Sequence, residues 1–151
     1  LVLLGKQMKI KVITSYKPGT RNNYAKRAVT SVLKYWPKDV DVYIYHEAQT
    51  QDIFEQPRIK WVDLHEVQPE LVKFKQRHKD DPVANGLNVS YIWNAVRFAN
   101  KVFCVTHAIK TSDGYDYVIW LDADTYTFRP MPTEFLENLL PVSIPRSSHN
   151  S

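Results

Sequence analysis

The sequence is poor in cysteine and glycine and lacks a long apolar run. These shortages argue against a disulfide, a glycine-rich phosphate loop and a membrane span. Its single cysteine, Cys104, cannot form an internal disulfide, which favours a reducing compartment and predicts a cytoplasmic protein. Only four glycines occur, and they build no glycine-rich phosphate loop after the first apolar segment. No apolar run approaches the roughly 18 residues that a membrane-spanning helix needs. We therefore expect no membrane span.

Length and composition are those of one folded domain. The chain has 151 residues, of which 44% are hydrophobic and 13% aromatic, which excludes a disordered polypeptide. Its net charge of +4 and pI of about 9.1 suit a phosphate-bearing ligand, but this basicity is too weak to predict nucleic-acid binding. Residues 1–7 are interpreted as a leader or a vector-derived extension, because Met8 looks like a natural start. The domain is expected to span residues 8–151.

Two kinds of apolar pattern alternate along the chain. Short runs rich in β-branched and aromatic residues predict strands at 9–16, 40–45, 58–64, 118–121 and, beginning another, 141–145. Amphipathic segments predict helices at 24–35, after Pro69, at 89–110 and at 132–140. The third strand is more polar and is expected nearer an edge. This alternation predicts an α/β fold, a three-layer α/β/α sandwich around a mostly parallel, Rossmann-like sheet.

Two aspartates follow the strand predicted at 118–121. An unbroken apolar run of this kind is typical of a strand buried on both faces, and here it leads directly into Asp122 and Asp124. Residues i and i+2 of an extended chain point the same way, so both carboxylates are expected on one side. They stay ionised together most easily with a cation between them. The second Asp-x-Asp of the chain, Asp39 and Asp41, is interpreted as a solvated loop.

Polar residues also follow the first two predicted strands, as Thr14-Ser15-Tyr16 and as His46-Glu47. The carboxyl ends of parallel strands meet at one edge of the sheet, where ligands of open α/β folds bind. Tyr16 is a candidate for stacking on a base, and Glu47 for accepting a hydrogen bond from it. These residues are therefore expected to lie near the two aspartates.

A basic pair occurs on the long helix predicted before the aspartates. Arg97 and Lys101 are four residues apart, so they share one flank and suit a common phosphate group. Mg²⁺ or Mn²⁺ is commonly held by one or two carboxylates, with substrate phosphates completing its shell. The paired aspartates and the basic helix together predict a site for a metal-bound diphosphate, in which the metal assists the departure of the leaving group.

With these features the sequence resembles the nucleotide-sugar glycosyltransferases of the GT-A fold, of the Asp-x-Asp type. The resemblance covers residues 8–144, the nucleotide-binding half of that fold, and implies a transferase that uses a nucleotide-sugar donor, with a UDP-sugar expected. It implies that Asp124 binds Mn²⁺ or Mg²⁺ and that Asp122 contacts the metal or the ribose. The acceptor is not identified.

The same resemblance implies roles for the remaining candidates. The end of the first strand, Thr14 to Tyr16, would line the pocket for the nucleobase and ribose, and Glu47 matches an acidic position at the end of the second. Arg97 resembles the helix residue that reaches the diphosphate or the donor sugar, and Lys101 is expected to assist it. In that family a third metal ligand and the acceptor-binding residues come from a later segment, so the domain is expected to be incomplete at its C-terminus.

Other functions remain open. One alternative is a truncated or non-catalytic domain that binds a nucleotide sugar, because the second half of that fold is missing from the sequence. No general base can be named, and His149 matches no metal ligand. A phosphatase of the haloacid dehalogenase type is a weaker alternative, since its aspartate pair follows the first strand and it has Thr or Val where this chain has Tyr126. The scarcity of glycine argues against a sugar-nucleotide pyrophosphorylase.

Overall fold

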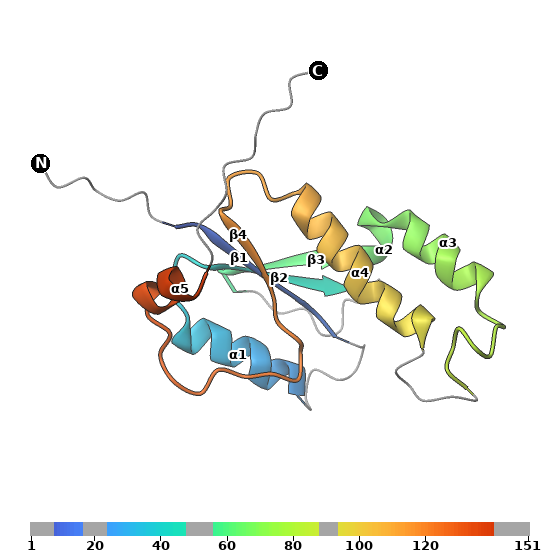
Figure 1. The fold of residues 1–151 in the computed structure, drawn as a ribbon, viewed down its shortest axis with the longest axis horizontal. Coiled ribbons are helices and arrows are strands. Elements are labelled where there is room, and N and C mark those ends of the chain that lie inside the picture. The colour runs from blue at the N-terminus through green and yellow to red at the C-terminus, as the bar shows by residue number, and fades with distance from the viewer. Residues whose placement is uncertain (1–7, 17–23, 48–55, 88–93, 141–151) are drawn as a thin grey trace, which may run out of the picture.

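A computed structural model describes residues 8–16, 24–47, 56–87 and 94–140. Its strands form one parallel sheet in the order β3-β2-β1-β4 (Figure 1). The strands are β1 (Ile10–Ser15), β2 (Asp41–His46), β3 (Ile59–Asp63) and β4 (Tyr117–Trp120). The predicted α/β fold with a parallel sheet is confirmed, as is the edge position of the third strand.

The strand that precedes the aspartates is more exposed than the sequence suggested. All four residues of β4 are half-buried, whereas a strand buried on both faces was expected. The reason is its position, because among the described strands β4 pairs only with β1 and ends the sheet on that side.

One face of the sheet is covered by α1 (Lys26–Tyr35). Its apolar side packs on the β1 and β2 side chains that point to this face, and Trp36, just after the helix, joins them. Helix α5 (Thr133–Leu139) adds the buried Leu136 to the same core. The buried members of this first core are Ile10, Val12, Val29, Val32, Trp36, Val40, Val42, Ile44, Ile59 and Leu136.

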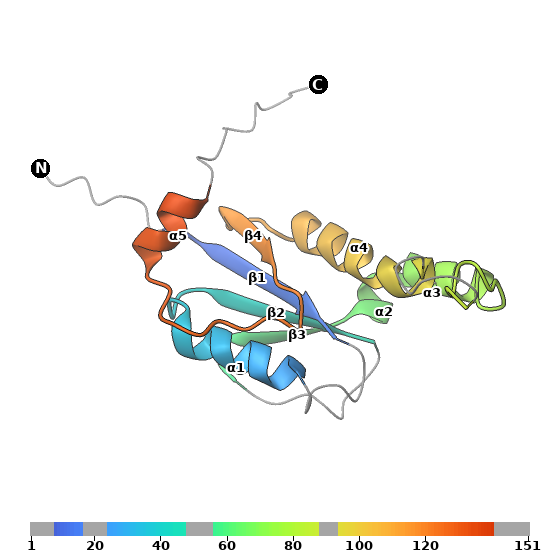
Figure 2. The ribbon, with the colours of Figure 1, turned by 60° about the horizontal axis from the view of Figure 1, so that its bottom comes forward.

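The opposite face carries α2 (Leu64–Val67), α3 (Pro69–Arg77) and α4 (Ala95–Lys110). Figure 2 shows α1 and α4 on the two sides of the sheet. Alternation along the strands sends Ile13 and Tyr45 to this side, where they form a second core with Leu64, Leu71, Ala99, Cys104 and Ala108. Helices on both faces leave the ends of the strands as the accessible edges of the sheet.

The predicted elements need two corrections. The long helix begins at Ala95 and not at 89, because the Asn94 side chain accepts from the Arg97 N–H and caps it; residues 88–93 lie outside the described ranges. The short helix α2 was not predicted. It follows β3 because the Asp63 carboxylate accepts from the His65 and Glu66 N–H groups. The strand expected at 141–145 also lies outside the described residues.

Asp41 is a third correction, since it is no part of a solvated loop. It is the first residue of β2, and its Oδ2 accepts a hydrogen bond of 2.5 Å from the Tyr115 hydroxyl. That hydroxyl also lies 3.2 Å from the Tyr43 hydroxyl, and the buried Lys11 places its Nζ 4.2 Å from the centre of the Tyr43 ring. The polar cluster joins β1, β2 and the segment before β4 at the edge remote from Asp122.

Burial makes the lone cysteine unreactive. Cys104 is fully buried between α4 and the sheet, and burial raises the pKa of its thiol to about 12. We predict that the folded protein does not react with Ellman's reagent at pH 8 and that one thiol reacts after denaturation in guanidinium chloride. Fast labelling of the native protein would contradict this packing of α4.

Candidate functional site at the carboxyl edge

The two aspartates occupy a tight turn. The Asp122 carbonyl accepts from the Thr125 N–H at 3.0 Å and from the Thr125 hydroxyl at 2.6 Å, so Ala123 and Asp124 form the middle of the turn. The extended geometry expected from the i, i+2 spacing is therefore wrong, because the extended chain ends before Ala123. Both carboxylates are exposed at the carboxyl end of β4.

The Asp122 carboxylate is held through one oxygen. Its Oδ1 accepts from the Trp120 indole Nε1–H at 2.6 Å and from the Lys101 ammonium at 3.0 Å. These bonds, the indole first and the ammonium second, lower the pKa of Asp122. The second oxygen, Oδ2, accepts no hydrogen bond from the described residues, so it is available to a cation.

Of the two cations expected on the long helix, Lys101 contacts the site. Lys101 reaches Asp122 from α4, and its Nζ also lies 5.0 Å from the centre of the Trp120 ring. Arg97 lies one turn nearer the start of α4, about 6 Å further along the helix axis. Its side chain is exposed, and its guanidinium forms no hydrogen bond or ion pair with the described residues. Because α4 runs antiparallel to β4, Arg97 projects beyond the carboxyl edge.

The three candidates at the end of β1 point in different directions. Thr14 is buried on the α1 face, and its hydroxyl has no hydrogen-bond partner in the described part of the chain. Ser15 lies on the α4 face, where its hydroxyl forms a hydrogen bond with the Cys104 thiol. This bond lowers the pKa of the thiol, but burial raises that pKa by more. The Tyr16 ring packs edge-on against Trp61, with 6.4 Å between centroids. A single ligand group therefore does not contact all three.

Glu47 is engaged with other side chains. Its Oε2 lies 2.5 Å from the Lys75 ammonium of α3 and 3.5 Å from His65 Nε2 of α2. Three-quarters of the Glu47 side chain is buried. Through Oε2, the carboxylate fastens α2 and α3 to the end of β2.

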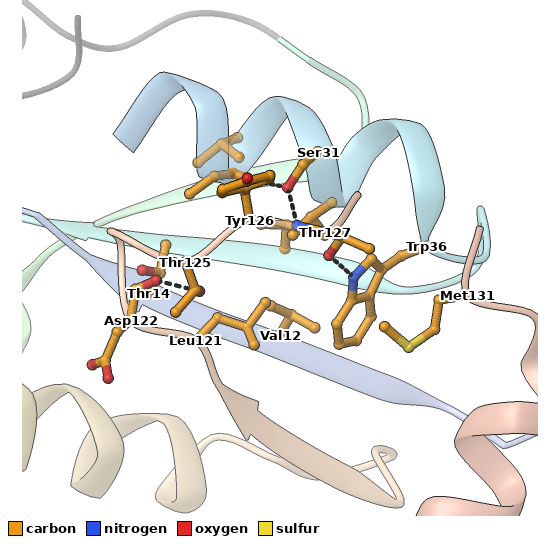
Figure 3. A pocket seen from close by; sticks show the side chains of 14 residues that line it. Val12, Thr14, Ser31, Trp36, Leu121, Asp122, Thr125, Tyr126, Thr127 and Met131 are labelled. Carbon is orange, nitrogen blue, oxygen red and sulfur yellow. Dashed lines mark hydrogen bonds between the residues drawn. The ribbon is translucent and has the colours of Figure 1, made fainter. Parts of the chain in front are cut away.

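A cavity of about 190 Å³ lies between the sheet, α1 and the segment that follows β4. Figure 3 shows Val12, Leu121, Trp36 and Met131 in its largely apolar wall. The Asp122 carboxylate points away from this space, toward α4 (Figure 3). A diphosphate bound to Asp122 would therefore lie outside the cavity, on the α4 side of the edge.

Several functional contacts escaped the sequence analysis. The Trp120 indole was missed although the i, i+2 rule, applied two residues earlier, places Trp120 and Asp122 on one side. Lys75 and His65 carry no local signal, because only the packing of α2 and α3 brings them to Glu47.

The donor set fits a metal that arrives with its ligand. The described residues contain no group of three or more His, Cys, Asp or Glu side chains suited to a metal ion. One free oxygen of Asp122 and the exposed Asp124 carboxylate make an incomplete oxygen shell, of the kind that Mg²⁺ or Mn²⁺ completes with water and phosphate oxygens. These residues suit such an ion better than a permanently held one.

Comparisons with protein-family models, with curated proteins and with solved structures find no match to this chain. Among the described helices, none has both the length and the apolar character required to cross a membrane.

The two donors to Asp122 can be tested separately. We predict that Trp120→Phe and Lys101→Ala each raise the pKa of Asp122, because each variant removes a hydrogen bond that lowers it. The measurement is a ¹³C NMR titration of the Asp122 carboxyl between pH 2 and 7. A lowered pKa stabilises the folded state at neutral pH, and this contribution is lost as the pH falls through the folded pKa. An unchanged titration in both variants would contradict the observed geometry.

Proposed function

We propose that the chain is the donor-binding domain of a metal-dependent glycosyltransferase that takes a nucleoside-diphosphate sugar, with a UDP-sugar as the expected donor. The observation that carries the proposal is the Asp122 carboxylate at the carboxyl end of β4. One oxygen is fixed by Trp120 and Lys101, and the other accepts no hydrogen bond from the part of the chain that the structure describes. The exposed Asp124 in the same turn and Arg97 beyond the edge supply a second carboxylate and a second cation.

In this proposal each residue has a distinct task. Asp124 and Asp122 Oδ2 hold Mn²⁺ or Mg²⁺, which supplies positive charge to the departing diphosphate when bound. Arg97 binds phosphate oxygens, for which its planar guanidinium is suited. Lys101 neutralises Asp122 in the ligand-free protein and is placed to contact phosphate when a metal takes over that carboxylate. Thr14 to Tyr16 and Glu47 remain proposed contacts for the nucleobase and ribose, and a cytoplasmic location stays part of the proposal.

One observation favours a second candidate, a domain that binds the nucleotide sugar without catalysing transfer. Glu47 is the remaining acidic residue proposed at this edge, and Lys75 holds it at 2.5 Å, so it is a poor general base. A haloacid dehalogenase-type phosphatase gains no support, because the aspartates follow β4 and not the first strand.

The proposal predicts that metal and nucleotide bind cooperatively. Isothermal titration calorimetry should show UDP binding about tenfold or more tighter with Mn²⁺ than without it, since phosphate oxygens complete the shell that two carboxylates leave open. Asp124→Asn should abolish the gain and shift the Tm by no more than about 2 °C, because the side chain is exposed. The matched control is Asp113→Asn, which alters an exposed aspartate before β4. Equal UDP affinity with and without Mn²⁺ would overturn the proposal.

The two cations of α4 should respond differently. Arg97→Ala should weaken UDP binding by about 1.5–3 kcal/mol and leave uridine binding unchanged, because it removes a charged bond to phosphate. Lys101→Ala should weaken UDP less and should tighten Mn²⁺ binding in the absence of nucleotide, because it removes a positive charge 3.0 Å from Asp122. Equal losses for uridine and UDP in Arg97→Ala would contradict a phosphate contact.

A further inference from the structure

A second hollow lies outside the carboxyl edge, on the outer side of α1. This α1 groove has a volume of about 480 Å³, within the range of ligand sites. It is bounded by α1 and by the segment that runs back from the Asp122 turn. The side chains that give it its character are Lys26, Arg27, Lys34, Tyr35, Tyr126 and Phe128.

The α1 groove is positively charged, and its described lining holds no counter-charge. It is lined by three cations and no carboxylate, and these cations form no ion pair with the described residues. Their neighbours are aromatic rings, since the Arg27 guanidinium lies 3.5 Å from the centre of the Tyr126 ring and Lys34 Nζ 4.9 Å from that of Tyr35. An anionic ligand would therefore meet unpaired charge at this surface.

The same groove exposes flat apolar surface. Phe128 is 72% exposed and Tyr126 is 47% exposed, and such rings pack on a ligand that has apolar faces. Lys26 and Lys34 are two helical turns apart, about 12 Å along the axis. The groove thus suits an extended ligand that carries anionic groups at intervals and presents C–H faces between them.

The backbone of the groove wall is anchored to α1. The Thr127 N–H donates to the Ser31 hydroxyl at 2.9 Å, and the Trp36 indole donates to the Thr127 hydroxyl at 2.8 Å. Figure 3 shows Ser31, Tyr126, Thr127 and Trp36 along the helix. Tyr126 follows Asp124 by two residues, so one end of the groove lies close to the proposed metal turn.

We propose that the α1 groove binds an anionic oligosaccharide, carboxylated or sulfated, as the acceptor of the transfer. This inference rests on the proposed glycosyltransferase function, because it supplies the second substrate next to the donor site. A saccharide is favoured over single-stranded nucleic acid because the proposed function transfers a sugar to an acceptor, and the first test below includes a nucleic-acid probe.

The first test compares ligands. Calorimetry with the purified chain would use tetragalacturonate as the anionic saccharide, maltotetraose as its neutral counterpart and dT4 as the nucleic-acid probe. The expected result is binding of tetragalacturonate that weakens as salt is added, with no binding of maltotetraose. Equal binding of the two saccharides, no binding of either, or tighter binding of dT4 would each overturn the proposal.

The second test compares variants of equal net charge. The Lys26→Ser/Lys34→Ser double variant should weaken tetragalacturonate binding by about tenfold, as expected for two partly exposed charge contacts. The control, Lys38→Ser/Lys110→Ser, removes two exposed lysines that do not line the groove and should bind as the wild type does. An equal loss in both variants would show a general charge effect and overturn the proposed site.

The donor site is measured separately in the same samples. The groove variant should keep Mn²⁺-dependent UDP binding, and Asp124→Asn should keep tetragalacturonate binding. If UDP fails to bind while tetragalacturonate binding depends on Lys26 and Lys34, the donor assignment is wrong and the groove is still a saccharide site. If UDP binds as proposed and tetragalacturonate does not, the groove inference alone is wrong.

Discussion

The pairing of β1 with a parallel strand on each side is the constraint on which the site depends. Residues 11–15 pair with 41–45 of β2, and residues 10–13 pair with 117–120 of β4. The ladder continues one step further, since the Leu121 N–H donates to the Ile13 carbonyl at 3.0 Å. Extended pairing thus ends immediately before Asp122. The turn that carries both aspartates begins where the pairing with β1 ends.

Charge balance explains why Asp122 has two unlike partners. An exposed carboxylate beside another carboxylate is stabilised by a nearby positive charge, and Lys101 supplies it in the ligand-free protein. The indole of Trp120 fixes the same oxygen without adding charge. In the proposed site, a divalent ion would therefore bind the other oxygen of Asp122 and would be repelled by the Lys101 ammonium. The negative charge of an accompanying diphosphate would offset that repulsion.

Local patterns in the sequence were sufficient for the fold and for the position of the edge. The apolar runs and the helical spacing led to a parallel α/β sheet, and the four-residue spacing of Arg97 and Lys101 placed both on the flank of α4 that faces the edge. The conformation of the aspartates was missed because it depends on a turn that the Thr125 N–H and hydroxyl both close on the Asp122 carbonyl. The partners of Glu47 and of Asp41 come from elements distant in sequence, so no local pattern reveals them.

The segment after β4 connects the two faces of the sheet. Asp122 turns its carboxylate to the α4 side, and five residues later Thr127 is bonded to Ser31 and Trp36 on the α1 side. Both ends of this short stretch are therefore fixed by packed elements, one by the ladder to β1 and the other by α1. The backbone between Asp124 and Tyr126 therefore has little freedom to move. A metal held at Asp124 and a ligand in contact with Tyr126 would both bind to this stretch. The relative position of the two proposed substrates is thus set by the packing of α1 on the sheet.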